Sequence, residues 1–227
     1  ESYAYLKYDI RTNRRNCLLL AIPTMYAIAN TGVREHVGET YDRMMMKRPG
    51  DMHLTQMLER NTIPYGMRTM PTVLKYLTPL IYEELLIDGR IISPFHVRNR
   101  RFYRYKVSPF MRGAVIVSFR PRLKNTKLVR GWARIEESTG RILETSFDGE
   151  YDLVRFHVTM TTGDEGVKTL MPAQCNLNTR FLFLGNDITA EYTTVYDLPK
   201  KLPDSVKIVN RSDTALLNLV RPIPANS

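Results

Sequence analysis

The sequence is poor in the residues that crosslink small proteins. Only two cysteines, Cys17 and Cys175, occur among 227 residues, far apart and without a second pair. This count excludes a cysteine-based zinc site and a disulfide framework. Two alternatives stay open: a single disulfide, which an oxidising compartment would allow, and two inert buried thiols.

Catalytic and cofactor-binding motifs are also missing. The sequence contains no G-x-S-x-G elbow, no P-loop, no G-x-G-x-x-G, no H-E-x-x-H and no C-x-x-C. The four histidines are scattered, and no two share metal-ligand spacing. We therefore expect no enzyme, no metal site and no cofactor. The alternative is a nucleophilic Cys175 that meets His157 across a sheet.

Long hydrophobic runs are absent as well. The longest apolar stretch begins at Cys17 and is interrupted by Pro23, Thr24 and Asn30, so it is too short to span a bilayer. The opening ESYAYLKYDI lacks the basic start, apolar core and cleavage site of a signal peptide, as a mature protein or an excised segment would. We expect no transmembrane segment in this chain.

Positive charge is present in excess. Lys and Arg number 33 against 23 Asp and Glu, a formal net charge of +10. Such a charge attracts nucleic acid, anionic lipid headgroups or an acidic protein face, unless it is simply solvated. The basic clusters are not interleaved with aromatic residues in a known nucleic-acid motif, so nucleic acid is the least favoured partner.

We expect residues 1–227 to form a single domain, in which the hydrophobic pattern distinguishes three parts. From about 10 to 90 it predicts a mainly helical cover, with helices at 16–30 and 71–86. From about 100 to 196 it predicts an antiparallel meander, and 197–227 an extension and linker with a helix at 213–220. The predicted strands are 102–107, 114–120, 128–136, 142–147, 153–161, 167–171, 178–184 and 188–196.

Alternation assigns faces to the predicted strands. In 153–161 one face is apolar and the other polar, which is typical of a half-buried strand. By contrast, 114–119 and 181–184 are apolar on both faces, which predicts a cover on each side of the sheet there. The only tryptophan, Trp132, shares its face with Arg130 and Arg134, which indicates arginine stacking or a contact surface.

Several short segments carry a family resemblance. The hairpin at 116–147, with F-x-P at 119–121, resembles the lipoprotein-carrier (LolA/LolB) superfamily. It is similar, more closely, to uncharacterised outer-membrane-associated proteins of Bacteroidetes, which place such a domain between a carboxypeptidase-regulatory-like β-sandwich and a membrane barrel. The segment 14–29 resembles that family's R-N-P-L-L…P, and 102–107 and 221–224 also match.

The resemblance implies an α+β fold in which a curved antiparallel sheet, an unclosed β-barrel, carries helices on its concave face. It brings no catalytic residue with it. Between sheet and helices it implies an apolar cleft suited to acyl chains, which core side chains could fill instead. The residues expected to line this cleft are Val154, Phe156, Val158, Met160, Tyr103, Tyr105, Leu77 and Ile81.

These observations together predict a non-enzymatic periplasmic or outer-membrane-associated domain that binds a lipid, an acylated protein or another hydrophobic ligand. The alternative is a structural docking or spacer domain beside an outer-membrane barrel or lipoprotein partner, with Trp132, Arg130 and Arg134 as its contact surface. Nucleic-acid binding, which rests on charge alone, is the third hypothesis.

Overall fold

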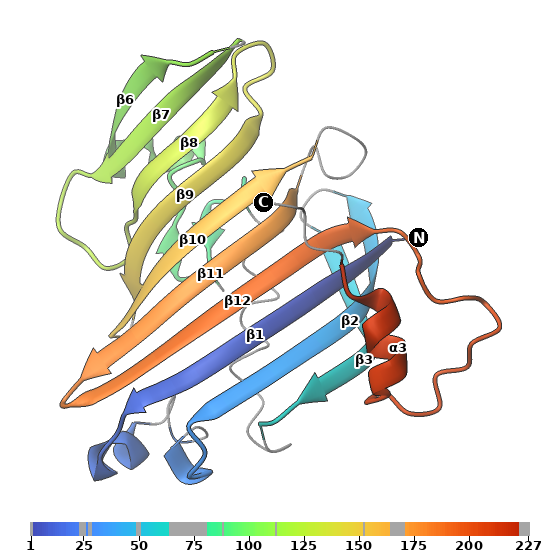
Figure 1. Ribbon diagram of the computed structural model, residues 1–227. Helices are drawn as coiled ribbons and strands as arrows, with labels where there is room; N and C mark the ends of the chain where they lie inside the picture. Colours follow the sequence, from blue (N-terminus) through green and yellow to red (C-terminus); the bar gives the residue numbers. More distant parts are fainter. Residues whose placement is uncertain are drawn as a thin grey trace.

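One open sheet dominates the computed structural model (Figure 1). The structure describes residues 2–22, 26, 29–48, 51–63, 81–87, 89–111, 113–151, 153–163 and 171–222. Ten antiparallel strands lie in the order β3-β2-β1-β12-β11-β10-β9-β8-β7-β6. Among the described residues, the edge strands β3 and β6 do not pair with each other, so the sheet is not closed into a barrel.

Strands account for most of the described chain, and the other elements are short. A two-residue pair, β4 (Leu85–Leu86) and β5 (Ile91–Ile92), forms a second small sheet. Among the described residues, the helical elements with defined bounds are the 3-10 helices η1 (Cys17–Ala21) and η3 (Val97–Phe102) and the α-helix α3 (Thr214–Val220), and residues 26, 29 and 30 are also helical. The strands of the large sheet are β1 (Ser2–Arg14), β2 (Glu35–Arg48), β3 (Asp51–Asn61), β6 (Tyr103–Pro109), β7 (Ala114–Pro121), β8 (Arg130–Glu136), β9 (Ile142–Tyr151), β10 (Val154–Thr162), β11 (Pro172–Phe183) and β12 (Asn186–Leu198).

The predicted meander over 100–196 is confirmed for β6 to β10 and for β11 and β12, which pair with their sequence neighbours. Of the predicted strand 167–171, only Met171 lies within the described residues, where it forms a bend. The short helix predicted at 213–220 is also confirmed, because Asp213 caps α3 by accepting hydrogen bonds from Ala215 N and Leu216 N.

The mainly helical cover predicted over 10–90 is wrong in its first part. Residues 35–48 and 51–61 are the long strands β2 and β3. The helix predicted at 16–30 starts as the 3-10 helix η1, and of its later residues 26, 29 and 30 are helical, while 23–25, 27 and 28 lie outside the described part. Of the helix predicted at 71–86, residues 71–80 lie outside the described part, and 81–86 are a turn followed by β4. Helices on the concave face are therefore not confirmed.

The main hydrophobic core lies on one face of the sheet, which we call the inner face. Tyr8 and Ile10 of β1 and Val158 of β10 are almost completely buried there. Non-strand segments cover this face: η1 contributes Leu19, and the stretch around the β4–β5 pair contributes Ile81, Leu86 and Ile91. Within the described residues, this cover consists of loops and short elements.

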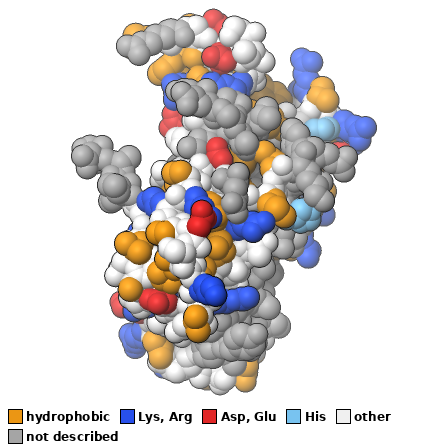
Figure 2. All heavy atoms as spheres, turned by 90° about the vertical axis from the view of Figure 1, so that its right-hand side faces the viewer, with side chains coloured by type: hydrophobic (Ala, Val, Ile, Leu, Met, Phe, Trp, Pro, Cys, Tyr) orange, Lys and Arg blue, Asp and Glu red, His pale blue; other side chains and the backbone are white. Residues whose placement is uncertain are grey.

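The opposite, outer face is covered only in part. Tyr3, Tyr41 and Leu58 point outward from β1, β2 and β3 and pack against Leu217 and Val220 of α3. Tyr3 and Tyr41 stack in parallel, with ring centroids 5.0 Å apart. Figure 2 shows the molecule from the right-hand side of Figure 1, where hydrophobic side chains lie in small groups among Lys, Arg, Asp and Glu.

The cover predicted on both faces of 181–184 is wrong for Leu182 and Leu184. Both are about half exposed, and only Phe181 is fully buried in the inner core. Leu184 lies in the β11–β12 turn, beyond the region that either cover reaches. Among the described helices, none is long and apolar enough to cross a membrane.

An ion pair fixes the segment after α3 to the outer face. The Arg221 guanidinium donates two hydrogen bonds to the Glu39 carboxylate, at 2.5 and 2.8 Å, and Tyr5 Oη donates a third at 2.6 Å. The Arg221 contact, followed by the Tyr5 hydrogen bond, holds the pKa of Glu39 below its usual value against the opposing effect of burial. This bidentate contact ties residues 182 positions apart in the sequence.

Glycines inside the sheet make room for aromatic rings on the inner face. The ring of Tyr8 crosses over Gly38, its partner on β2, and the ring of Phe156 crosses over Gly149, its partner on β9. A Cβ added at Gly149 would lie 2.3 Å from Phe156 Cζ, well inside van der Waals contact. A side chain at either position would push the ring out of the core.

Gly149→Ala should therefore lower the free energy of unfolding by about 1–3 kcal/mol, the usual cost of overpacking. Urea unfolding of the wild type and the variant measures this loss. In a Phe156→Leu background the same substitution should cost clearly less, since the clashing ring is gone. An equal cost in both backgrounds would contradict the packing of Phe156 over Gly149.

The Glu39 ion pair predicts a loss of stability in acid. Because the folded-state pKa of Glu39 is lowered, its contribution is fully present above the unfolded pKa, about 4.3, and is lost as the pH falls through the folded pKa. Glu39→Gln should cost about 2 kcal/mol at neutral pH. In melting curves recorded down through the acid range, the gap between wild type and variant should close; a gap that stays constant would refute the assignment.

Candidate functional site

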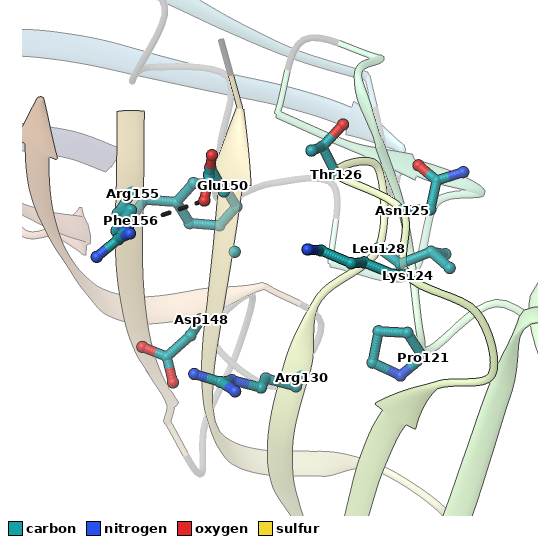
Figure 3. Close-up of a pocket in the computed structure, with 11 residues that line it drawn as sticks. Pro121, Lys124, Asn125, Thr126, Leu128, Arg130, Asp148, Glu150, Arg155 and Phe156 are labelled. Carbon is teal, nitrogen blue, oxygen red and sulfur yellow. Dashed lines mark ion pairs between the residues drawn. The ribbon is translucent and has the colours of Figure 1, made fainter. Parts of the chain in front are cut away.

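A pocket lies where strand β8 is shorter than its neighbours. Strand β8 begins at Arg130, opposite Asp148, whereas β9 continues to Tyr151 before the chain turns back into β10. The β9–β10 hairpin therefore extends past β8, and the loop 122–129 lies opposite it (Figure 3). The space between them, which we call the loop pocket, has a volume of about 570 Å³. This is within the usual range for small-molecule sites.

The loop pocket combines an apolar floor with a charged opening. Its apolar side chains are Pro121, Leu128 and Phe156, and Phe156 belongs to the main core. In Figure 3 the Lys124 side chain extends from the loop toward the β9–β10 hairpin. The charged side chains that line the pocket are Lys124, Arg130, Asp148, Glu150 and Arg155.

The two acids of the pocket each have a basic neighbour. Arg155 Nε lies 3.8 Å from Glu150 Oε2, an exposed pair that contributes little to stability. Arg130 and Asp148 are directly opposed across β8 and β9, and Figure 3 shows their charged ends side by side. Among the described residues Lys124 has no ion-pair partner, so its ammonium group is available to an anion.

Most of the residues predicted to line an apolar cleft lie together in the main core. Phe156, Val158 and Met160 are at most 7% exposed, and Tyr103 and Ile81 are fully buried with them. Val154 packs against the same cluster, and Leu77 lies outside the described residues. Of this set, Phe156 reaches the loop pocket; ligand binding by the others stays a prediction.

Tyr105 takes a different place from the rest of the predicted cleft. It lies on the edge strand β6 and lines a separate hollow of about 410 Å³ together with Phe119 and Arg104. Its hydroxyl donates a hydrogen bond of 2.7 Å to the carbonyl of Pro94, which fixes the ring against the preceding loop. Burial raises the pKa of the Tyr105 hydroxyl, so it stays a neutral donor.

The predicted contact surface lies on the outer face of β8, as alternation indicated. Trp132 is partly buried and lies opposite Ser118 and Ser146 of the neighbouring strands. Arg134 pairs with Glu144 at 3.3 Å. Arg130 instead reaches the loop pocket, so the three predicted residues are divided between the outer face and the pocket.

The catalytic pairing of Cys175 with His157 is wrong. Cys175 opposes Met160 on the inner face, whereas His157, three residues before Met160 on β10, points to the outer face. Burial raises the pKa of the Cys175 thiol to about 12, so it stays protonated. Cys17 is exposed and both thiols are free, which rules out the disulfide and also the burial expected for Cys17.

His157 has other partners that the sequence did not suggest. Its Nδ1 lies 2.9 Å from Asp148 Oδ1, and its Nε2 lies 3.4 Å from Ser146 Oγ. The hydrogen bonds therefore link a serine to a histidine and the histidine to an aspartate, as in the catalytic triad of a serine protease. All three residues, however, lie within paired strands, where the backbone amides around Ser146 are used by the ladders to β8 and β10. A developing oxyanion would find no backbone donors at this position.

The comparisons with known proteins identify the family. A model of the family described as "Family of unknown function (DUF5686)" matches residues 6–198, from β1 to the end of β12. The chain belongs to this family. No curated protein matches it. The structural likeness found is to a LolA superfamily protein, NE2245 from Nitrosomonas europaea, at 10% sequence identity and a TM-score of 0.25, over 89% of this chain and 88% of that one.

That structural likeness is too low to define a fold or a function for this chain. The expectation of an uncharacterised family is confirmed at the level of DUF5686. The relation to the lipoprotein-carrier superfamily and the Bacteroidetes context stay predictions from the sequence.

The arrangement of Ser146, His157 and Asp148 makes a sharp test of the non-enzymatic expectation. Without oxyanion donors, Ser146 should be no better a nucleophile than any exposed serine, and Ser146→Ala should leave the slow hydrolysis of p-nitrophenyl acetate unchanged. His157→Gln is the matched control for general-base chemistry by the imidazole alone. A rate that both substitutions abolish would identify a hydrolase and overturn the expectation.

Proposed function

We propose that this chain is a non-enzymatic binding domain of the cell envelope, and that its loop pocket holds an amphiphile with an acyl chain and an anionic head. The observation that carries this proposal is the composition of the pocket. Leu128 and Phe156 offer an apolar floor, and Lys124 places a cation at the opening. The envelope location rests on the sequence resemblance alone.

The filled inner core argues for this smaller site over a wide internal cleft. Among the described residues, the apolar side chains between the sheet and its cover pack into one cluster. Opening that cluster would expose side chains that are almost fully buried, at about 25 cal/mol for each Å² of apolar area. The loop pocket lies at the edge of this cluster, where Leu128 and Phe156, each 7% exposed, meet charged groups, so a ligand there would not have to open the whole core.

The charges of the pocket favour an anionic head over a cationic one. Glu150 and Asp148 each have a basic neighbour, as described above, whereas Lys124 is available. A carboxylate or phosphate bound to Lys124 would form a charge-assisted hydrogen bond. The acyl chain would then lie along Leu128 and Phe156, away from water.

Binding of decanoate, used below its micellar concentration, tests the proposal. We expect decanoate to raise the melting temperature more than the uncharged decanol does. Lys124→Glu should weaken decanoate binding by about tenfold, since a hydrogen bond to a charged group contributes about 1.5–3 kcal/mol. Calorimetric titration gives both affinities.

The matched control is Lys207→Glu, which makes the same charge change at an exposed position outside the pocket. It should bind decanoate like the wild type. If both substitutions weakened decanoate binding equally, the effect would come from the net charge of the protein and the proposal would be wrong. A wild type that does not bind decanoate would also refute the proposal.

A further inference from the structure

The turns at one end of the sheet carry exposed leucines. Because the strands are antiparallel and consecutive, the β7–β8 loop, the β9–β10 turn, the β11–β12 turn and the end of β1 all lie at this end. Figure 1 shows them along the left and lower left edge of the sheet. Six leucines there, 45–78% exposed, form what we call the leucine rim: Leu18, Leu20, Leu123, Leu153, Leu182 and Leu184.

Two of these leucines adopt a backbone conformation that leucine disfavours. Leu153 has a φ of 68° and Leu184 a φ of 47°, both in the left-handed region. Leu184 and Gly185 form a two-residue hairpin turn with two positive φ angles, a turn in which Asn-Gly is the preferred pair. At each position the apolar side chain is exposed to water and the backbone has a positive φ, and both features cost free energy. The stability of the fold gives no reason for leucine at these two positions, whereas a contact between the leucine side chains and a partner would give one.

Hydrogen bonds hold part of the rim together. Asn16 Nδ2 donates to the carbonyl of Leu184 at 2.6 Å, and Asn186 Oδ1 accepts from the backbone N–H of Asn16 at 2.7 Å. Asn186 is fully buried, which anchors η1, with Leu18 and Leu20, beside the β11–β12 turn. On the other side Val154 pairs with Phe181, so the turn with Leu153 lies next to Leu182.

The rim is also positively charged. The segments that form it, residues 14–20, 122–127, 150–155 and 180–187, contain seven Lys and Arg against three Asp and Glu. Of the three acids, Glu150 pairs with Arg155 and Asp187 with Arg180. The sequence from 89 to 135, which includes the β7–β8 loop, has 13 Lys and Arg and no acid. Long-range attraction at this end therefore favours an anionic partner.

We propose that the leucine rim docks on the surface of an anionic lipid bilayer, with the leucines entering the boundary between headgroups and acyl chains and the basic residues contacting the headgroups. Exposed aliphatic side chains among cations suit this boundary. Nucleic acid would instead favour several stacking aromatic side chains, whereas Phe183, 37% exposed, is the one large exposed aromatic among the described residues of the β11–β12 turn.

This docking gives the loop pocket a source of ligand; the two proposals share Lys124 among their charges but depend on different apolar residues. Lys124 and Leu128 of the pocket belong to the same β7–β8 loop as Leu123. Leu153 and Leu184 do not line the pocket. Vesicle binding can therefore fail while decanoate binding persists, and the reverse.

Flotation with lipid vesicles tests the docking. The wild type should float with vesicles made of equal parts phosphatidylcholine and phosphatidylglycerol, and much less with phosphatidylcholine alone. High salt should weaken the binding. The double variant Leu153→Asn, Leu184→Asn should bind the anionic vesicles at least tenfold more weakly. Since asparagine tolerates positive φ better than leucine, its melting temperature should not fall, which separates lost binding from misfolding.

The matched control is Met111→Asn together with Val209→Asn, which removes two strongly exposed apolar side chains away from the rim. This control should bind vesicles like the wild type. Equal loss in both double variants would overturn the proposal, as would a wild type that ignores anionic vesicles. A wild type that ignores vesicles but forms a dimer dependent on Leu153 and Leu184 would identify a second copy as the occupant, which also overturns it.

Discussion

The fold depends on the pairing of its first long strand with its last. β1 lies between β12 and β2, with Tyr8 opposite Tyr192 in the middle of the ladder. This pairing joins residues 173 to 195 positions apart, from Arg14 with Asp187 to Tyr3 with Leu198, and attaches the β1–β2–β3 group to the meander that follows. Without it the sheet would end at β12, and the inner core would lose Tyr8 and Ile10. Closing so long a loop costs entropy, which the long ladder and the buried side chains of β1 offset.

The sequence predicted the local part of the fold and missed the long-range part. Strand β10 alternates between apolar and polar residues, because one of its faces is buried and the other is wet, and turn residues separate the strands of the meander on either side of it. The first half of β1 gives no such alternation, since α3 and its neighbours cover its outer face and Tyr3, Ala4, Tyr5 and Leu6 are all buried; the second half, from Leu6 to Arg11, does alternate. β2 gives none, because its inner face carries Gly38, Thr40 and Asp42. The periodicity therefore identifies the meander and the second half of β1, but not β2.

The candidate site was predictable only in its apolar half. Alternation placed Phe156 on the core side of β10, and Arg130 on the outer face of β8, but gave no reason for them to line one pocket. That proximity follows from strand length, because β8 starts too late to cover the end of the β9–β10 hairpin. Lys124 reaches the same space from a loop, and hydrophobic periodicity does not predict the conformation of a loop. A difference in length between neighbouring strands is the signal that could have located the pocket.

The connectivity of the sheet explains why the pocket and the leucine rim lie at the same end. In an antiparallel meander, alternate connections lie at alternate ends, so the β7–β8, β9–β10 and β11–β12 connections share one end by necessity. β1 runs antiparallel to β12 and finishes at that end too, which brings η1 beside Leu184. The opposite end receives the β6–β7 and β8–β9 connections, where Gly113 and Gly140 take the positive φ angles. At that end Asp197 also has a positive φ, and at the rim Gly185 does, but Leu153 and Leu184 are the rim residues that adopt this conformation with a large apolar side chain. Glycine would adopt these backbone conformations without strain. A contact of the Leu153 and Leu184 side chains outside the fold gives a reason for leucine at these two positions.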